Sequence, residues 1–316
     1  MKSVLNSIPS KRGARLRRAP LSVAVGLAVS TTLLAALGGV AGASSPYYGA
    51  IKEVTSLHNE VPAKYVTGGV KVAVFNDWAP DEFMANGHLT GWSVDLAHAI
   101  SSTLGLKFTY VPTSFDAVLP GLQNGRFDLG FASFAPTAPR LQVLSFIPER
   151  SDGTAYASKS SSNFKITKIS NLCGLTVAEL TGAYDFTYLT GVSKTTCVAH
   201  GKTAITLDQF PTQTAAQLAV TSGRVQLVAA GSATLNYWAK QTGGITVSTF
   251  IANADYNCIG VSKTNPLGNI VAQAMQQLIK TGVYKKIMAH WGLATADPVT
   301  RGMFITAKNP TGAGPA

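Results

Sequence analysis

Residues 91–140 constrain the fold most strongly, because helical and strand periods alternate along this stretch. Leu96, Ile100 and Leu104 recur at four-residue steps, which puts them on one face of a predicted helix. A strand period, a second helical stripe and a short apolar run follow. The predicted elements are a helix at 94–104, a strand at 106–110, a helix at 115–122 and a strand at 127–131. This order predicts an α/β fold with a mostly parallel sheet.

A polar turn follows the last of these strands and ends in Arg140. Ligands of open parallel sheets bind beyond the carboxyl ends of strands, and both Ser133 and Arg140 directly follow such an end. A guanidinium can hold a carboxylate through two parallel hydrogen bonds. The sequence therefore predicts a ligand site here with Arg140 as a carboxylate clamp; a surface salt bridge is the alternative role.

Composition indicates a compact globular protein that does not bind nucleic acid. The chain has 316 residues, of which 46% are hydrophobic and 13% charged. Its formal net charge is +11, but six of the 26 basic residues precede residue 19, and no acid occurs before Glu53. The rest of the chain is mildly basic and has no basic run interleaved with aromatic residues, which excludes nucleic-acid binding as the expected function.

Residues 1–43 have the organisation of a cleavable secretory signal. A basic start leads into the apolar stretch 21–40, and Ala41-Gly42-Ala43 offers a small-residue cleavage site. An uncleaved membrane anchor is the alternative, because the apolar stretch approaches the ~20 residues that span a bilayer. The choice between general and twin-arginine export stays open. We expect a soluble periplasmic protein.

Three motifs in this chain stand in the order and spacing of a known family. They are G-W-S-V-D-L from Gly91, S-F-D-A-V-L-P-G-L-x-x-G-R-F-D from Ser114, and S-x-A-x-T-x-x-R from Ser133. The chain resembles the family 3 solute-binding proteins over residues 70–293. The resemblance implies a two-lobed type II periplasmic binding fold with two hinge crossings. It also implies a monomeric receptor that captures a small carboxylate, foremost an amino acid, for an ABC transporter permease, without a metal or another cofactor.

The resemblance also implies the domain boundaries. Lobe 1 would comprise residues 70–152 and 254–307, and lobe 2 residues 153–253. An N-terminal extension at 44–69 and a disordered tail at 308–316 would flank them. In lobe 2 the sequence predicts strands at 175–179, 204–207 and 225–230 and helices at 214–221 and 232–240, with a return crossing at 247–251. A long amphipathic helix at 269–280 would rejoin lobe 1.

Several residues match ligand-binding positions of the family. Trp78, before Ala-Pro, and Phe115 would stack on the body of the ligand, although either could simply pack in the core. The other matching positions are Ser133, Ala135, Arg140, Gly182 and Tyr184. The last two stand at a predicted helix start, where free N–H groups suit an anion.

Gly231 departs from the family, which usually places an aspartate there to bind the α-ammonium group of the ligand. Without that carboxylate the ammonium group needs another partner. The candidate replacements are Asp77, Asp81, Asp185 and Asp255. If none of them serves, the ligand would be an organic acid without an amino group.

The three cysteines allow at most one intramolecular disulfide. The resemblance implies a Cys173–Cys197 bridge. Cys258 lies in an apolar strand context and is expected to be a buried free thiol.

The sequence gives little support for catalysis. The five histidines are scattered without metal-site spacing, and Gly91-Trp92-Ser93-Val94-Asp95 lacks the second glycine of a nucleophile elbow. The enzyme alternative is a cyclohexadienyl dehydratase-like protein on the same fold, which would need a general acid. A sensor-associated receptor domain is a third possibility.

Overall fold

The structure is a computed structural model that describes residues 47–293 and 298–312. The expected signal sequence at 1–43 therefore lies outside the described residues, as do residues 313–316. Within the described part, no helix is long and apolar enough to cross a bilayer.

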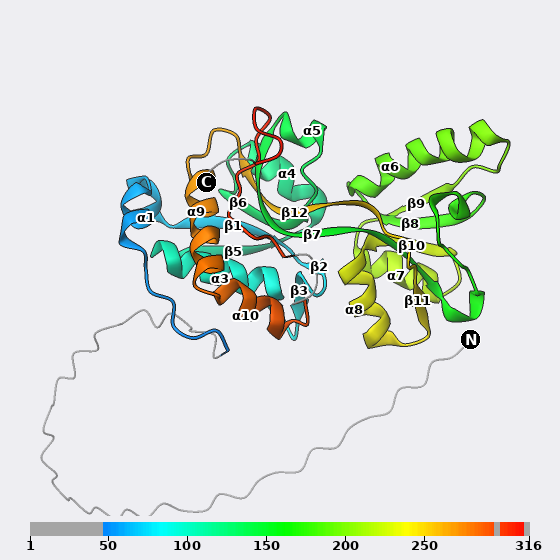
Figure 1. Cartoon of the computed structure of the whole chain (residues 1–316), viewed down its shortest axis with the longest axis horizontal. Helices are drawn as coiled ribbons and strands as arrows, with labels where there is room; N and C mark the ends of the chain where they lie inside the picture. Colours follow the sequence, from blue (N-terminus) through cyan, green and yellow to red (C-terminus); the bar gives the residue numbers. More distant parts are fainter. Residues whose placement is uncertain (1–46, 294–297, 313–316) are drawn as a thin grey trace, which may run out of the picture. The chain divides into compact units, whose positions relative to one another are not determined.

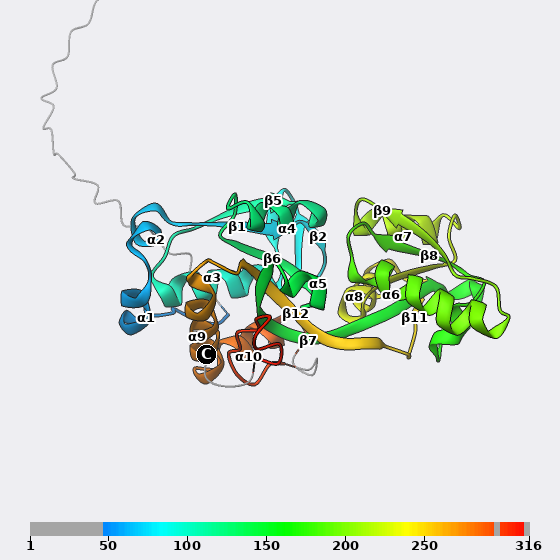
Figure 2. The same ribbon diagram turned by 90° about the horizontal axis from the view of Figure 1, so that it is seen from above.

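The described chain forms two groups of elements joined by two long strands (Figure 1). The joining strands are β7 (Leu144–Lys159) and β12 (Ala252–Ser262). They pair antiparallel with one another and run side by side between the two groups (Figure 2). One sheet thus continues through the chain in the order β5-β1-β6-β12-β7-β10-β8-β9, with β11 beside β7.

The first group, lobe 1, holds a parallel core of three strands. They are β1 (Val70–Phe75), β5 (Phe108–Thr113) and β6 (Leu129–Phe134). A small antiparallel sheet of β2 (Asp77–Trp78), β3 (Glu82–Ala85) and β4 (His88–Thr90) follows β1. The helices are α1 (Thr55–Glu60), α2 (Ala63–Gly68), α3 (Trp92–Leu104), α4 (Phe115–Gln123), α5 (Ala138–Leu141), α9 (Leu267–Lys280) and α10 (Val283–His290).

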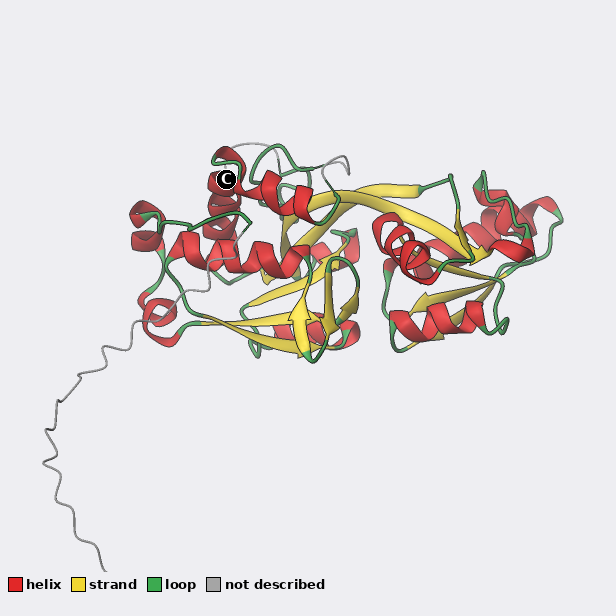
Figure 3. Ribbon diagram, turned by 90° about the horizontal axis from the view of Figure 1, so that it is seen from below, coloured by secondary structure: helices red, strands yellow, loops and turns green. Residues whose placement is uncertain are grey.

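The second group, lobe 2, repeats this plan around β10 (Leu227–Gly231), β8 (Thr176–Leu180) and β9 (Thr206–Phe210), which are parallel to one another. Its helices are α6 (Tyr184–Val192), α7 (Gln213–Thr221) and α8 (Ser232–Thr242), and β11 (Ile245–Val247) pairs with β7. Short helical turns occupy Ser160–Ser162, Ile169–Leu172, Ser193–Cys197 and Val198–His200. Helices lie on both faces of the strands (Figure 3).

Local periodicity predicted the helix α3 and the strands β5 and β6, because the apolar faces of these elements are the buried ones. Leu96, Ile100 and Leu104 of α3 are fully buried, and Met275 of α9 packs into the same cluster. The α/β class with mostly parallel pairing is confirmed. The antiparallel pairs of the large sheet all involve β7 or β12, the strands on which the chain crosses between the lobes and returns.

The predicted helices and strands lie within about three residues of the observed ones, whereas two other predicted segments differ more. Residues 245–247 belong to β11 inside lobe 2, and the return crossing is β12 instead of 247–251. Pairing with β7 satisfies the backbone groups of the returning chain, which an unpaired crossing at 247–251 could not do. Residues 308–312 were expected to be disordered. In the structure Asn309 forms an antiparallel β-bridge with Thr306, and the nearby Ile305 forms another with Phe146.

The predicted N-terminal extension contributes to the lobe 1 core. Residues 44–69 contain α1 and α2, and their Leu57, Val61 and Tyr65 are buried in the same cluster as α3. The described part of this segment therefore packs against the lobe.

Candidate functional site

A pocket lies where lobe 1, lobe 2 and the two crossing strands meet, and we call it the site pocket. Its walls from lobe 1 are Trp78, Phe115, Ala132, Ser133, Ala135 and Arg140. Its walls from β7 and β12 are Asp152, Gly153, Thr154, Asn253, Asp255, Tyr256 and Asn257. Lobe 2 contributes Leu180, Ala183, Tyr184, Asp185 and Gly231. Six of the predicted ligand-binding residues therefore share one pocket, whereas Gly182 and Asp77 are not among its walls.

Arg140 is held in the pocket by carbonyl groups from both lobes. Its Nη1 donates to Ala135 O at 3.1 Å, and its Nη2 donates to Gly182 O at 3.1 Å. The guanidinium also lies over the rings of Phe115 and Phe134, at 5.5 and 5.4 Å from their centroids. Burial lowers the pKa of Arg140 to about 10, so the group stays cationic at neutral pH. A guanidinium has five N–H donors, so it can also hold a carboxylate.

The two predicted stacking residues are anchored in the core and also face the pocket. Phe115 is the first residue of α4, and its ring packs edge-on against Phe75 at 5.6 Å. Trp78, in β2, lies 6.2 Å from the same Phe75 ring. Core packing thus fixes the two aromatic walls.

The hydroxyl group of Ser133 donates its hydrogen to a protein carboxylate. Its Oγ donates to Asp81 Oδ2 at 3.0 Å, behind the pocket wall. Its φ is +45°, a left-handed conformation that is uncommon for a non-glycine residue and often found at functional sites. The hydroxyl hydrogen is therefore used within the protein, whereas the hydroxyl oxygen can still accept a hydrogen bond in the pocket.

At the start of α6, Gly182 and Tyr184 have different roles. Gly182 gives its carbonyl oxygen to Arg140, whereas Tyr184 lines the pocket and stacks against Tyr188 at 6.0 Å. The neighbouring Asp185 is 9% exposed and accepts a hydrogen bond from Thr154 Oγ1. Burial raises the pKa of Asp185.

Asp77, which the sequence offered as a candidate ligand residue, lies in a contact between the lobes. Its carboxylate accepts the backbone N–H of Thr214 at 2.8 Å and also the hydroxyl of Thr214. Thr214 is in the first turn of α7, where unpaired N–H groups and the helix dipole attract an acid. Asp77 therefore caps a lobe 2 helix from lobe 1.

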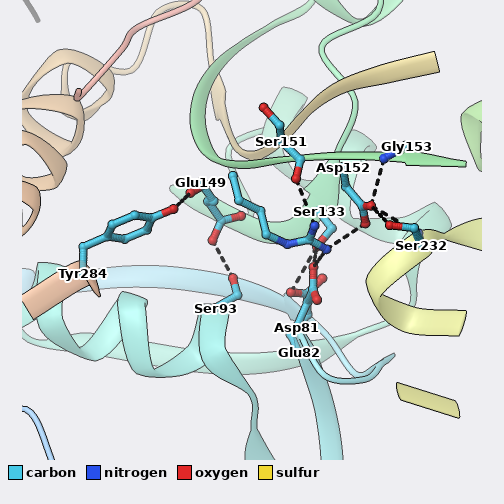
Figure 4. Close-up of polar contacts among 11 residues, drawn as sticks. Asp81, Glu82, Ser93, Ser133, Glu149, Ser151, Asp152, Gly153, Ser232 and Tyr284 are labelled. Atoms are coloured by element: carbon cyan, nitrogen blue, oxygen red, sulfur yellow. Dashed lines mark hydrogen bonds and ion pairs between the residues drawn. The ribbon is translucent and has the colours of Figure 1, made fainter. Parts of the chain in front are cut away.

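A buried charged cluster, which we call the Arg150 cluster, comprises Asp81, Glu82, Glu149, Arg150 and Asp152 (Figure 4). Arg150 is fully buried and donates through Nη2 to Asp81 at 2.9 Å and to Asp152 at 2.8 Å. Burial raises the pKa of Glu149 to about 8, and burial together with the charge of Asp81 raises the pKa of Glu82. Two buried glutamic acids with raised pKa values therefore accompany an Asp–Arg–Asp ion-pair group.

Sequence reasoning missed Asp152 as a pocket residue. The predicted boundary between lobe 1 and lobe 2 falls between Asp152 and Gly153, but β7 continues through both residues. The Asp152 side chain is 4% exposed and lies beside Gly231, where the family aspartate was expected. The run Pro148-Glu149-Arg150-Ser151-Asp152, with three charged residues directly after the apolar pair Phe146-Ile147, was the signal that could have revealed it.

Two further site expectations can be compared with the described residues. The disulfide joins Cys173 and Cys197 as expected, and Cys258 is a buried free thiol. Between Tyr47 and Leu293 and from residue 298 to 312, no three potential metal ligands lie together.

Comparisons with known proteins agree with this architecture. Residues 70–294 match the bacterial extracellular solute-binding proteins, family 3. The arginine-binding protein ArgT of Corynebacterium glutamicum is 30% identical over 244 residues, which cover 76% of this chain and 80% of that protein. A mutant of ArgBP from T. maritima superposes with a TM-score of 0.65 at 26% identity, covering 73% of this chain and 98% of that one.

An ancestral arginine-binding protein solved with bound arginine also superposes on this chain. The TM-score is 0.63 at 28% identity, and the match covers 70% of this chain and 97% of that one. These matches confirm the resemblance found in the sequence motifs. The chain belongs to the family 3 bacterial extracellular solute-binding proteins.

Proposed function

We propose that this protein binds a free amino acid with a cationic side chain, of the arginine type, in the site pocket. The observation that carries the proposal is the charge of the pocket walls. Among the described lining residues Arg140 is the one lysine or arginine, whereas Asp152, Asp185 and Asp255 are acids. A ligand with one carboxylate and two cationic groups complements this distribution.

The crossing strands explain why a cation would be favoured. Asp152 of β7 and Asp255 of β12 are register partners in the antiparallel pair. Like charges placed directly opposite each other destabilise a sheet. A cationic ligand between or beside these carboxylates would relieve that repulsion, so binding energy and hinge geometry would be coupled.

The names of related proteins support the same ligand class. The C. glutamicum relative is an arginine-binding protein, and an ancestral relative was solved with arginine bound. Arg140 would hold the α-carboxylate, while Trp78 and Phe115 would enclose the aliphatic part of the ligand. Asp255, at the rim, would face the side-chain cation.

Transport is the physiological role that we propose for this binding. A ligand that contacts both lobes favours the conformation in which both contacts exist, and a permease can distinguish that conformation from the ligand-free protein. The permease partner, the cleaved signal and the periplasmic location are parts of this proposal. The family description supports an extracellular site of action.

The enzyme alternative has one observation in its favour. Asp185 lines the pocket and has a raised pKa, as a general acid requires. Its carboxylate is engaged by Thr154, however, and burial is the largest cause of its raised pKa. We propose a non-catalytic protein, and incubation with prephenate or arogenate should therefore yield no product.

Isothermal titration calorimetry with arginine and citrulline tests the proposed function. Citrulline has nearly the shape of arginine but lacks its side-chain charge. Arginine should bind at least tenfold more tightly, a difference of about 1.4 kcal/mol. Equal affinities would refute the cationic ligand class, and failure of every amino acid to bind would refute the receptor function.

A further inference from the structure

Gly231 leaves a gap in the wall of the site pocket that another residue fills. A Cβ atom at this position would lie 2.7 Å from Asp152 Oδ2 and 3.6 Å from Trp78 Cζ2. A separation of 2.7 Å is closer than real Cβ atoms tolerate. A side chain at 231 and the present Asp152 carboxylate therefore exclude each other.

We infer that Asp152 receives the α-ammonium group of the ligand, an inference that rests on the proposed function. The pairing of β7 with β10 brings it there, since Thr154 is the register partner of Gly231. The carboxylate thus comes from the crossing strand and lies beside the Trp78 ring. An acid at this point would complete the recognition of an amino acid whose carboxylate is held by Arg140.

The Asp152 oxygen nearest to the gap has capacity for another donor. Oδ2 accepts a bond from Arg150, whereas Oδ1 accepts bonds from Gly153 N, Ser232 N and Ser232 Oγ. A carboxylate offers about four acceptor positions, two on each oxygen. Oδ1 is saturated, and Oδ2 retains one position for an ammonium hydrogen.

The positive charge of Arg150 is shared between two carboxylates, so it does not fully neutralise Asp152. Arg150 donates to Asp81 as well as to Asp152, so one guanidinium serves two carboxylates. Arg150, Asp81 and Asp152 together have one guanidinium and two carboxylates, which leaves one negative charge in excess. A ligand ammonium would balance it.

The other acidic candidates fit the ammonium role less well. Asp77 is bound to Thr214, and Asp81 lies behind Ser133, so neither lines the pocket. Asp185 lines it but has a buried carboxyl engaged by Thr154. Asp255 is exposed and suits the ligand's side chain.

The test compares arginine with 5-guanidinopentanoate, which is arginine without its α-amino group. Calorimetry on wild-type protein should show a clear preference for arginine. Asp152→Asn should weaken arginine binding about ten- to hundredfold, the factor for losing a hydrogen bond to a charged group. Binding of 5-guanidinopentanoate should change less than threefold, because that ligand has no ammonium group to lose.

Two further variants separate recognition from folding. Gly231→Ala adds only the Cβ atom that would displace Asp152, and it should reduce the same preference while Asp152 is kept. The double variant D152A/G231D removes the side chain that occupies this space and moves the carboxylate to the other strand, and it should recover part of the preference. Asp255→Asn is the matched control, which should reduce the preference for arginine over citrulline instead.

Two outcomes would overturn the inference. One is an Asp152→Asn variant that is folded and weakens both ligands by the same factor, since that marks a structural role. The other is an unchanged preference in both Asp152→Asn and Gly231→Ala. The proposed function fails separately, if wild-type protein binds no amino acid at all.

Discussion

At the scale of single residues, the proposed carboxylate clamp depends on how Arg140 is held. Two backbone carbonyls, one from each lobe, orient its guanidinium, and two aromatic rings lie beneath it. Arg140→Ala should lower arginine affinity at least tenfold, because a charge-assisted bidentate contact is lost. Calorimetry should also show that the variant no longer prefers arginine over agmatine, which lacks the carboxylate.

A surface variant provides the control for Arg140. Arg126 is exposed beside Phe127, away from the site pocket, and Arg126→Ala removes the same charge from the same lobe. It should bind arginine as the wild type does. If Arg140→Ala keeps its preference over agmatine, the carboxylate is held elsewhere.

Sequence reasoning identified Arg140 but not Asp152, for a physical reason. Arg140 follows a strand end in a local motif, and local periodicity predicts such ends. The proximity of Asp152 to Gly231 depends on pairing between β7 and β10, which are about 70 residues apart in the chain. Burial of the charged run in β7 was likewise hidden, because it results from packing by several distant elements.

At the scale of elements, the crossing strand β7 contains a residue that makes the stability of the fold depend on pH. Glu149 is fully buried, and its pKa is raised to about 8 from the ordinary 4.5. A carboxyl group whose pKa is raised in the folded protein contributes stability that is fully present below the pKa of the unfolded state. This contribution is lost as the pH rises through the pKa of the folded state. Stability should therefore fall between pH 4.5 and 8, by up to about 1.4 kcal/mol per pH unit for this one proton.

Glu149→Gln should remove this dependence without loss of the Ser93 bond, because Ser93 donates its hydroxyl to Glu149 Oε1 and an amide oxygen can accept it. Urea unfolding at pH 5, 6, 7 and 8 should give a flatter profile than in the wild type. The exposed Glu60→Gln serves as control and should keep the wild-type slope. Parallel profiles for wild type and Glu149→Gln would contradict the assignment.

The disulfide stabilises the helical segment of lobe 2 between β8 and β9. Cys173 and Cys197 are 24 residues apart, so replacing both by alanine should cost roughly 3–4 kcal/mol by the chain-entropy estimate. Urea unfolding measures this loss. Reductant should bring the wild type close to the double variant and should leave the variant unchanged, whereas an unaltered midpoint would show that the bridge contributes little.

At the scale of the whole molecule, ligand binding and stability should be linked. A ligand that binds only the folded protein, at 100 times its dissociation constant, adds about 2.7 kcal/mol. For a chain of this size that corresponds to a rise in melting temperature of about 5–10 °C. Differential scanning fluorimetry should show this rise with arginine and not with agmatine; equal shifts would mean that the α-carboxylate is not recognised.

The two-lobed architecture could be predicted because the sequence motifs resemble a known family, while local periodicity predicted the α/β order within each lobe. The exact return crossing could not, since β12 is defined by its pairing with β7 and β6 across the whole chain. The inter-lobe contact of Asp77 with Thr214 is also a product of the assembled fold, because the two residues lie 137 positions apart.

The most direct test of the account is a crystal structure of the protein grown with arginine. The account predicts the α-carboxylate on the Arg140 guanidinium, the α-ammonium group beside Asp152 Oδ2 and the aliphatic chain between Trp78 and Phe115. Arginine bound in the opposite direction, with its guanidinium at Asp152 and its carboxylate away from Arg140, would contradict it. So would density for arginine only outside the site pocket.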